Sequence, residues 1–308
     1  MTKFVAGCLF FVLCAIGLSI PVLAAEQDDK WSVMLNEFAC NLGNAESCVN
    51  LGVLYQQSSS VYRDDEKAVA LFQTGCEDGV SQGCANLGAM YESGKGVELD
   101  SNIAASFYLK ACEVGNSLGC SNLGSMYEHG RGISQNYIKA KSFYKKACDA
   151  GRVQGCSNLG FLYDEGRGVD QDLPKAIGLY KEACDASYGE GCFNLGWMYN
   201  QGRGVGKDNK KAADFYSLAC EIGLAKGCAY LGVLYFQGEG VEQNDKLAFS
   251  SFQEGCDGGS ARGCGYLGTM YFLGKGVDQD DEKAVKFLTQ GCDAGSTKSC
   301  DILSLMSE

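Results

Sequence analysis

One arrangement of apolar positions recurs along most of this chain. Within residues 112–147, Leu123, Met126 and Tyr127 have the i, i+3, i+4 spacing that places apolar side chains on one face of an α-helix. Further along the same segment, Ala140 and Tyr144 have the spacing of a buried stripe on a second helix. The pattern therefore predicts two short amphipathic helices in each unit.

The residues around these stretches indicate where each helix begins and ends. Gly130-Arg131-Gly132 separates the two helices, and Asn136 stands at a position where other units carry Asp or Asn, both strong N-cap residues. Gly115 closes the preceding helix, and glycine recurs there in every unit but one, which has Ser187. Gly124 and its counterparts lie inside the first helix. Because a glycine there costs about 1 kcal/mol relative to alanine, its recurrence predicts close helix packing.

Cysteine repeats with the same period. Sixteen of the 18 cysteines form eight C-x7-C pairs, and successive pairs begin 36 residues apart. A fixed period of 20–50 residues is typical of stacked repeats, and one helix pair cannot bury its own apolar face. We therefore predict an all-α fold, a right-handed α/α solenoid of 36-residue helix pairs. It forms one domain over residues 26–308, with capping helices at 26–39 and 300–308. The paired cysteines are Cys40, Cys48, Cys76, Cys84, Cys112, Cys120, Cys148, Cys156, Cys184, Cys192, Cys220, Cys228, Cys256, Cys264, Cys292 and Cys300.

The first 25 residues have the pattern of a cleaved signal peptide. Lys3 is the only charge before Glu26, and residues 4–20 are apolar or small throughout. Val22-Leu23-Ala24 then presents small or apolar residues where a signal peptidase reads. An uncleaved anchor helix is the alternative, but 17 residues is at the short limit for crossing a bilayer. We expect an exported protein, periplasmic or secreted.

Each cysteine pair spans a corner between two predicted helices. The first cysteine ends a second helix and the other lies in the opening turn of the next first helix, so a short turn can bring them within bonding distance. Metal binding and redox chemistry are the alternatives, but no C-x-x-C occurs and the gap does not match the usual zinc spacings. We predict eight structural disulfides between neighbours. So many cysteines would be rare in the reducing cytosol.

The charge balance excludes several classes of partner. The formal net charge is −12, whereas affinity for nucleic acid or for an anionic membrane surface comes largely from Lys and Arg. A single histidine nearly excludes a His-rich metal site. We expect no cofactor, no metal, no nucleic acid and no membrane association after signal cleavage.

The repeat unit resembles a known family. The pattern L-G-x-[ML]-Y-x-x-G-[KR]-G-V, followed by K-A-x-x-[FY]-Y, is similar to the Sel1-like repeat, a relative of the tetratricopeptide repeat. The 36-residue period with its C-x7-C corner resembles the exported Helicobacter cysteine-rich proteins, over residues 26–308. The resemblance implies disulfide-bridged helix pairs in a superhelix. It also implies two different functions, because some members are named β-lactamases or penicillin-binding proteins and broader Sel1-like proteins are adaptors that bind partner chains.

A hydrolase needs residues that this sequence largely lacks. A serine β-lactamase combines Ser-x-x-Lys with Ser-Asp-Asn and Lys-Thr-Gly elements. Ser142-Phe143-Tyr144-Lys145 is the one Ser-x-x-Lys, it falls midway through a second helix, and the other two elements are absent. The single histidine, His129, lies in a turn. The catalytic residues stay unassigned, and weak hydrolysis of β-lactams, or binding of peptidoglycan-like small molecules, is the alternative function that the resemblance implies.

The variable positions of the first helices predict a ligand groove. Projected at 100° per residue, the face opposite the core carries Ser121, Ser125 and Glu128. In stacked helix pairs of this type, first helices line the concave surface. Along the stack this surface is acidic in its first half and aromatic in its second, beside a row of asparagines that gives way to tyrosine. The predicted groove residues are Asn86, Asn122, Asn158, Asn194, Glu128, Asp164, Phe161, Phe193, Trp197 and Tyr230.

The groove residues have competing interpretations. A regular row of amides can hydrogen-bond an extended peptide backbone, or each Asn can bond the neighbouring helix and only hold the stack. Trp197 and Phe161 are stronger candidates for ligand contact, because large exposed aromatic side chains are costly unless they are covered or functional. The alternative is that they pack in the core. We predict an exported scaffold that binds a protein or peptide, with a basic segment at the acidic half and an apolar segment near Trp197, flanked by Phe161 and Phe193.

Overall fold

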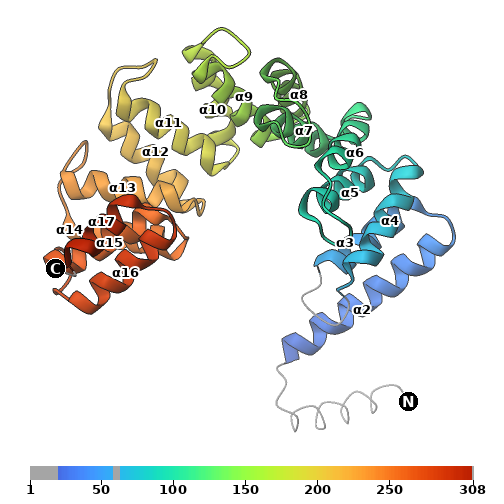
Figure 1. The fold of residues 1–308 in the computed structure, drawn as a ribbon, viewed down its shortest axis with the longest axis horizontal. Helices are drawn as coiled ribbons and strands as arrows, with labels where there is room; N and C mark the ends of the chain where they lie inside the picture. Colours follow the sequence, from blue (N-terminus) through green and yellow to red (C-terminus); the bar gives the residue numbers. More distant parts are fainter. Residues whose placement is uncertain (1–19, 58–62, 307–308) are drawn as a thin grey trace, which may run out of the picture. The chain divides into compact units, whose positions relative to one another are not determined.

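The computed structural model describes residues 20–57 and 63–306, and every regular element within them is a helix. The chain divides into two compact units, residues 1–135 and 136–308. The first unit contains α2 (Ile20–Asn41), α3 (Ala45–Gln57), α4 (Asp65–Glu77), α5 (Ser81–Ser93), α6 (Ser101–Glu113) and α7 (Ser117–His129) (Figure 1). The second contains α8 (Tyr137–Asp149), α9 (Val153–Glu165), α10 (Leu173–Asp185), α11 (Gly189–Gln201), α12 (Asn209–Glu221), α13 (Ala225–Gln237), α14 (Asp245–Asp257), α15 (Ala261–Leu273), α16 (Asp281–Asp293) and α17 (Thr297–Met306).

The helices alternate between two roles. Odd-numbered helices are the first helices of the repeats and are called A helices below, and even-numbered helices are the second and are called B helices. Within each unit, every helix packs against the helices before and after it in the chain. Successive A helices also touch, α5 with α7 in the first unit, and α11 with α13 and α13 with α15 in the second. The described fold is therefore an all-α solenoid of stacked helix pairs, as the repeat predicted.

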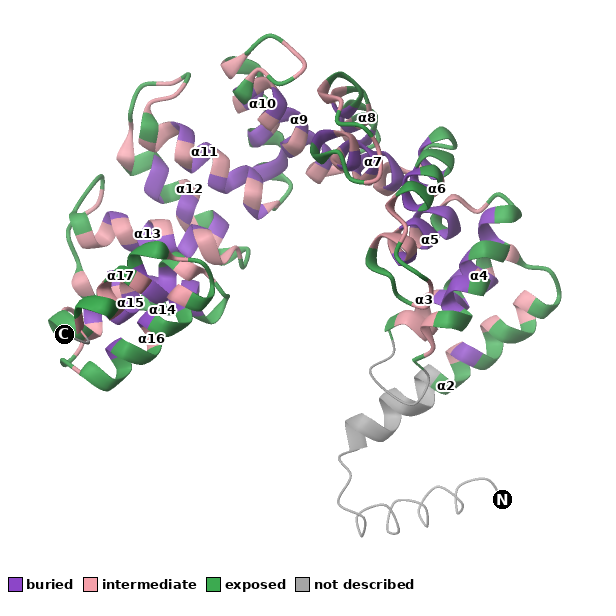
Figure 2. Ribbon diagram, viewed as in Figure 1, coloured by how far each residue is buried: buried purple, intermediate pink, exposed green. Residues whose placement is uncertain are grey.

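The core of each unit lies where consecutive helices face one another, and the connecting turns are largely exposed (Figure 2). Large aromatic side chains of the B helices, such as Tyr108 and Tyr216, are fully buried against a glycine of their own A helix. A Cβ added at Gly88 would lie 2.8 Å from the Tyr108 ring, and one at Gly196 would lie 2.7 Å from the Tyr216 ring. The close packing predicted from these recurring glycines is confirmed.

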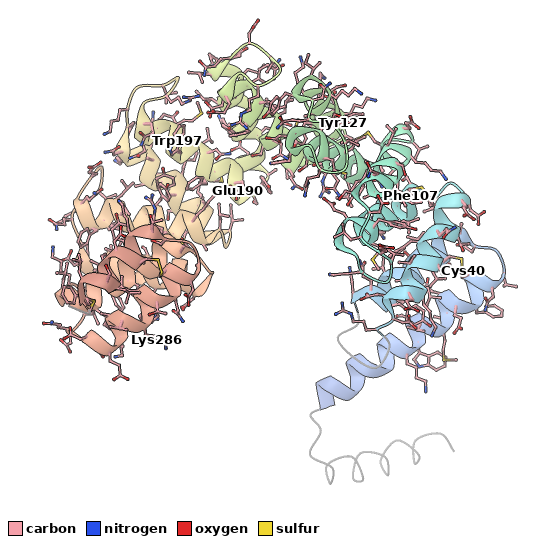
Figure 3. The ribbon with its side chains drawn as sticks, in the orientation of Figure 1. Cys40, Phe107, Tyr127, Glu190, Trp197 and Lys286 are labelled. Carbon is pink, nitrogen blue, oxygen red and sulfur yellow. A yellow bond between two sulfur atoms is a disulfide. The ribbon has the colours of Figure 1, made fainter. Side chains whose placement is uncertain are left out.

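Each of the eight predicted cysteine pairs is bonded in the structure (yellow in Figure 3). Every bridge joins the end of a B helix to the A helix that follows it. The Cα–Cα distances run from 4.4 Å for Cys256–Cys264 to 4.9 Å for Cys292–Cys300. Each repeat corner is therefore closed by a covalent bond, which holds the two helices beside it.

Two of these bridges have a carboxylate beside them. Glu182 lies near the sulfurs of Cys148–Cys156, and Glu254 lies near those of Cys220–Cys228. A metal would need a cysteine thiolate, and both sulfurs of each bridge are already in an S–S bond. These two groups are therefore parts of the disulfide framework and not ligand sets.

The turn between the helices of a repeat depends on caps and glycines. The A helix α5 ends at Gly94, with φ 65°, and the second turn glycine, Gly96, has φ 66°. A Cβ at Gly96 would lie 2.3 Å from the carbonyl oxygen of Asp65 in the preceding B helix, so the position lacks space as well. The next helix then begins at an Asp or Asn whose side chain accepts a backbone N–H. These capping residues are Asp64, Asp100, Asn136, Asp172, Asp208, Asn244 and Asp280.

Ser187 occupies the corner position at which the other repeats have glycine, and it adopts the same left-handed conformation with φ 60°. This conformation costs a residue with a Cβ about 1 kcal/mol. We expect Ser187→Gly to raise the free energy of unfolding by about that amount, measured by urea denaturation. The reverse change at the equivalent Gly151, where a Cβ would meet no neighbour within 4 Å, should lower it similarly. Unchanged midpoints for both variants would contradict this reading of the corner.

The two ends of the array are helical. Helix α2 includes residues 26–39, for which we predicted a capping helix, and α17 begins three residues before the predicted 300 and ends at Met306. Residues 1–19, which hold most of the predicted signal peptide, lie outside the described residues, as do 58–62 and 307–308. In the part of the chain that is described, no helix combines the length and the apolar character that crossing a bilayer requires.

Candidate ligand-binding face

The asparagine row lies half-buried on the A helices, and in the first unit Asn86 makes a hydrogen bond within its own helix. The Asn86 side chain accepts a hydrogen bond from Gln82 Nε2 at 2.7 Å. Gln82 and Asn86 both belong to α5, so this bond does not join neighbouring helices.

In the second unit the same row is open. Asn158 on α9 and Asn194 on α11 are half-buried, and neither side chain bonds another residue of the described chain. Tyr230 on α13 and Tyr266 on α15 continue the row. Each amide offers two N–H donors and a carbonyl acceptor, which is what an extended peptide backbone can pair with. The helices α11, α13 and α15 contact in succession, so Asn194, Tyr230 and Tyr266 share one surface, and α9, which carries Asn158, packs against α10 beside it. We call it the A-helix face of the second unit.

The predicted acidic half of the groove is not a row of free carboxylates. Asp164 is buried, and its Oδ1 lies 2.6 Å from Nε of Arg203, which belongs to the turn of the next repeat. In the first unit, Glu92 accepts a hydrogen bond from the Tyr108 hydroxyl at 2.7 Å and pairs with Arg131 at 2.9 Å. The placement of Asp164 on an exposed surface was wrong, because a following repeat covers that position with an arginine.

The prediction that Glu128 lies on an exposed surface was also wrong. Its side chain is buried although a single-helix projection placed it opposite the core. The following turn folds back over this end of α7, where Gln135 Nε2 donates to the Glu128 carbonyl oxygen at 2.7 Å. Gln171 makes the equivalent bond to Asp164. The turns therefore cover the acidic positions and leave them little contact with solvent.

The carboxylates also act on the tyrosines beside them. Burial, followed by the hydrogen bond to Glu92, raises the pKa of Tyr108 far above its ordinary value. Burial and the charge of Asp164 raise the pKa of Tyr180 in the same way. The hydrogen bond to Asp164 raises the pKa of Arg203, which is permanently charged. Tyrosine, carboxylate and arginine thus form a repeated group that links one repeat to the next.

Phe193 is part of the core and not of the predicted groove. It is only 9% exposed, and its ring centroid lies 5.4 Å from that of Tyr216 and 5.0 Å from that of Tyr230. Ser121 and Ser157, which occupy the same position in earlier repeats, are buried as well. Packing between neighbouring A helices covers this row, which a projection of one helix does not show.

Trp197 and Phe161 remain half-buried, and each lies under a cation. The guanidinium of Arg203 lies 5.7 Å from the Trp197 ring, and that of Arg167 lies 5.1 Å from the Phe161 ring. Trp197 and Glu190 both belong to α11 (Figure 3). The predicted aromatic half is therefore a surface of aromatic rings overlaid by positive charge.

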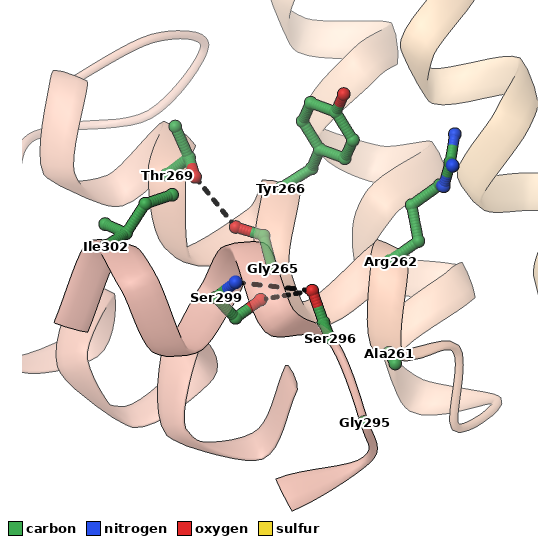
Figure 4. Close-up of a pocket in the computed structure, with 9 residues that line it drawn as sticks. All are labelled: Ala261, Arg262, Gly265, Tyr266, Thr269, Gly295, Ser296, Ser299 and Ile302. Carbon is green, nitrogen blue, oxygen red and sulfur yellow. Dashed lines mark hydrogen bonds between the residues drawn. The ribbon is translucent and has the colours of Figure 1, made fainter. Parts of the chain in front are cut away.

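A pocket of about 300 Å³ lies further along this face, at α15 and α17. Arg262 and Tyr266 project from α15 on one side, and Ser296 and Ser299 line the other (Figure 4). Ser299 donates to Ser296 Oγ at 2.9 Å, and Thr269 adds a third hydroxyl to the lining. The lining contains no carboxylate. Because Ser299 Oγ and Thr269 Oγ1 already donate within the protein, the site offers the Ser296 hydroxyl and one positive charge.

Seven consecutive segments of the chain match the Sel1 repeat, at residues 45–80, 81–116, 117–151, 153–188, 189–224, 225–260 and 261–296. The chain belongs to the Sel1 repeat family. With a disulfide at every corner it is a cysteine-rich Sel1-like repeat protein, as its motifs predicted. It is thus a helical repeat scaffold.

Several solved structures resemble the chain, and the first two of them show the same fold. The chain is 26% identical to a Sel1 repeat protein from Oxalobacter formigenes, over 89% of this chain and 80% of that one, with a TM-score of 0.73. It is 27% identical to a protective antigen of uropathogenic Escherichia coli strains displaying an SLR fold, over 88% of this chain, with a TM-score of 0.59. This chain spans 66% of the length of that protein. The Helicobacter pylori cysteine rich protein B is 34% identical over 43% of this chain and 96% of its own, with a TM-score of 0.36. No curated protein matches the chain.

The disulfides also indicate where this Sel1 repeat protein folds. Eight bridges form and persist only in an oxidising environment, such as the compartments outside the cytoplasm. The finding agrees with the export expected from the first 25 residues, which themselves lie mostly outside the described chain.

The Ser-x-x-Lys of this Sel1 repeat protein lies on an exposed stretch of α8. Ser142 is exposed, and Lys145 Nζ forms an ion pair with Asp149 at 2.6 Å. In the other unit, His129 is exposed and its Nδ1 lies 2.9 Å from the Ser125 carbonyl oxygen. A nucleophilic serine needs a base within hydrogen-bond reach, and the lysine amine is directed to a carboxylate instead.

We expect Ser142→Ala to leave the turnover of a chromogenic cephalosporin unchanged. The serine is a surface residue of a B helix, and its lysine neighbour forms an ion pair with Asp149. Initial rates for parent and variant at equal concentration check this expectation, with circular dichroism to confirm the fold. A loss of more than tenfold in the variant would show that this serine is catalytic after all.

The sequence interpretation missed the arginines of the turn. Arg131 and Arg203 each pair with a carboxylate 39 residues earlier in the chain, one repeat back. The signal was present in the G-[KR]-G turn. An arginine occupies the middle of this turn wherever the A helix of the preceding repeat carries Glu or Asp at the position of Glu92. Arg262, at the pocket, was missed because nothing in a single repeat marks it as unpaired.

Proposed function

We propose that this Sel1 repeat protein is a periplasmic or secreted scaffold that binds a protein or peptide segment along the A-helix face of its second unit. The observation that carries the proposal is the pair of half-buried amides without a protein partner, Asn158 and Asn194. Amide groups that no protein partner occupies can pair with a peptide backbone, which supplies alternating donors and acceptors.

The neighbouring rings support the same function. Trp197 and Phe161 keep part of their surface exposed beside the amides, although they are large and apolar. A peptide lying along the face would cover them, and burying apolar area contributes about 25 cal/mol per Å². The expected basic segment of the ligand is no longer part of the proposal, because Asp164 and Glu92 are already paired with arginines.

The test uses the oxidised protein and a random dodecapeptide display library. Selected peptides are synthesised, and their affinities are measured for the parent and for Asn194→Ala, Trp197→Ala and Lys181→Ala. Lys181 is an exposed residue of B helix α10 and serves as the matched control. We expect the Trp197 variant to bind at least tenfold more weakly and the Asn194 variant several-fold more weakly, with the control unchanged. Equal affinities across all four proteins would place the binding surface elsewhere.

A further inference from the structure

Arg262 is a positive charge without an acidic partner. Its guanidinium lies 4.3 Å from the centre of the Tyr230 ring and forms no ion pair with any residue of the described chain. Lys226, at the same position one repeat earlier, lies over Phe193 but is neutralised by Glu190. Stacking on a ring leaves the N–H groups at the edge of the guanidinium free to donate. Arg262 can therefore bind an anion from outside the protein, whereas Lys226 of the preceding repeat is already paired with Glu190.

A buried hydroxyl nearby also lacks a partner. Tyr216 is fully buried, and its hydroxyl makes no hydrogen bond. The equivalent hydroxyl of Tyr108 donates to Glu92, whereas the corresponding position before Tyr216 is Asn200, whose amide nitrogen donates to Asn209. An unsatisfied buried hydroxyl costs about 1–3 kcal/mol.

The surroundings of that hydroxyl point toward Arg262. Burial raises the pKa of Tyr216, and the two groups whose charges act on it are Tyr230 and Arg262. The Tyr216 and Tyr230 rings lie 5.4 Å apart, so Tyr230 stands beside both the hydroxyl and the guanidinium.

We propose that the A-helix face binds its peptide through a carboxylate group. The Arg262 guanidinium holds this carboxylate beside the hydroxyl-lined pocket. The Tyr216 hydroxyl donates a hydrogen bond to it after the Tyr230 ring has turned aside. This inference rests on the proposed function and adds the chemistry of the ligand. A planar guanidinium matches a planar carboxylate with two parallel hydrogen bonds. A single arginine is also the right charge for a monoanion, whereas a phosphate dianion would leave one charge uncompensated beside hydroxyls alone.

The overall charge of −12 does not oppose a local site of this kind. At physiological salt, exposed charges beyond about 8 Å are largely screened, so the groups next to the ligand decide its binding. The pocket lining next to Arg262 contains hydroxyl, apolar and glycine residues and no acid. The proposal therefore predicts binding of an acidic peptide by an acidic protein in 150 mM salt.

The experiment compares three acetylated hexapeptides that differ only in carboxylates. Hexaglutamate amide carries them on side chains, hexaglutamine with a free C-terminus carries one at its end, and hexaglutamine amide carries none. Each is titrated into the isotope-labelled oxidised protein while the Arg262 side-chain Nε–Hε signal is followed by NMR. The proteins are the parent, Arg262→Gln, Arg262→Lys, Tyr216→Phe and the control Lys181→Gln.

We expect at least one carboxylate peptide to shift the Arg262 signal and to bind at least tenfold more tightly than hexaglutamine amide. Which of the two does so tells whether the carboxylate comes from a side chain or a chain end. Arg262→Gln should abolish the preference, Arg262→Lys should keep part of it, and Lys181→Gln should keep all of it. Tyr216→Phe should weaken carboxylate binding at least threefold without lowering the thermal midpoint, because it removes an unpaired hydroxyl.

Two results would overturn the inference. One is that neither carboxylate peptide binds more tightly than hexaglutamine amide, and the other is a carboxylate preference that survives in Arg262→Gln. Neither result contradicts the proposed function. That function is tested separately, by the affinities of the Asn194 and Trp197 variants for the selected dodecapeptides. If Arg262→Gln does not fold, the Tyr216→Phe affinity and the Arg262 signal in the parent decide the question.

Discussion

Reduction of the eight disulfides is expected to unfold the protein. Each bridge closes a loop of nine residues, and constraining such a loop in the unfolded chain is worth about 2.5 kcal/mol on the chain-entropy model. Eight bridges together contribute on the order of 20 kcal/mol, whereas the net stability of a folded domain is about 5–15 kcal/mol. The helices alone are too short to persist, because isolated helices of 13 residues are marginal in water.

The measurement is helical circular dichroism during urea denaturation, with and without dithiothreitol. A matched pair of variants separates central from terminal bridges. Replacing Cys184 and Cys192 by alanine should lower the free energy of unfolding by about 2.5 kcal/mol. Replacing Cys292 and Cys300 should mainly fray α17, because repeats interact only with their neighbours. A reduced protein that keeps its helicity and its urea midpoint would show that helix packing alone suffices.

The sequence predicted the features that depend on one repeat. The C-x7-C spacing, the capping residues such as Asp64 and the turn glycines such as Gly96 each act within a few residues of the chain. Because these local signals recur with an invariant period, they fixed the helix pairs, the corners and the disulfide partners. Even Ser187 follows the rule of its position, since it takes the left-handed conformation of the glycines.

The face of each helix that stays open could not be predicted in the same way. A projection of one helix shows which residues lie opposite its own core, but it does not show what the next repeat places there. Asp164 and Phe193 were assigned to the groove on that basis, and the structure covers them with Arg203 and Tyr230. The unpaired state of Arg262 is likewise a property of three neighbouring repeats. Candidate ligand residues in a solenoid are therefore those that remain open after the stack has formed.

The largest effect of a single substitution is expected at Arg203. Its Nε lies 2.6 Å from Asp164 Oδ1, and its Nη2 donates to the Asp164 carbonyl oxygen at 2.7 Å. The Asp164 side chain is only 6% exposed. Arg203→Gln would leave that carboxylate buried without its cation, and breaking a buried pair from one side costs about 3–5 kcal/mol. Because Arg203 itself is partly exposed, we expect a loss of about 3 kcal/mol in the free energy of unfolding.

Arg131→Gln is the matched control, since it removes the equivalent arginine of the first unit. Its partner Glu92 is more exposed and keeps a hydrogen bond from Tyr108, so the loss should stay within about 1 kcal/mol. Adding Asp164→Asn to Arg203→Gln should restore part of the stability, because it removes the orphaned charge while keeping the shape of the side chain. Urea denaturation of the three variants measures these differences. Equal losses for Arg131→Gln and Arg203→Gln would mean that burial of Asp164 does not set the strength of the pair, and that the link between repeats is a surface ion pair in both units.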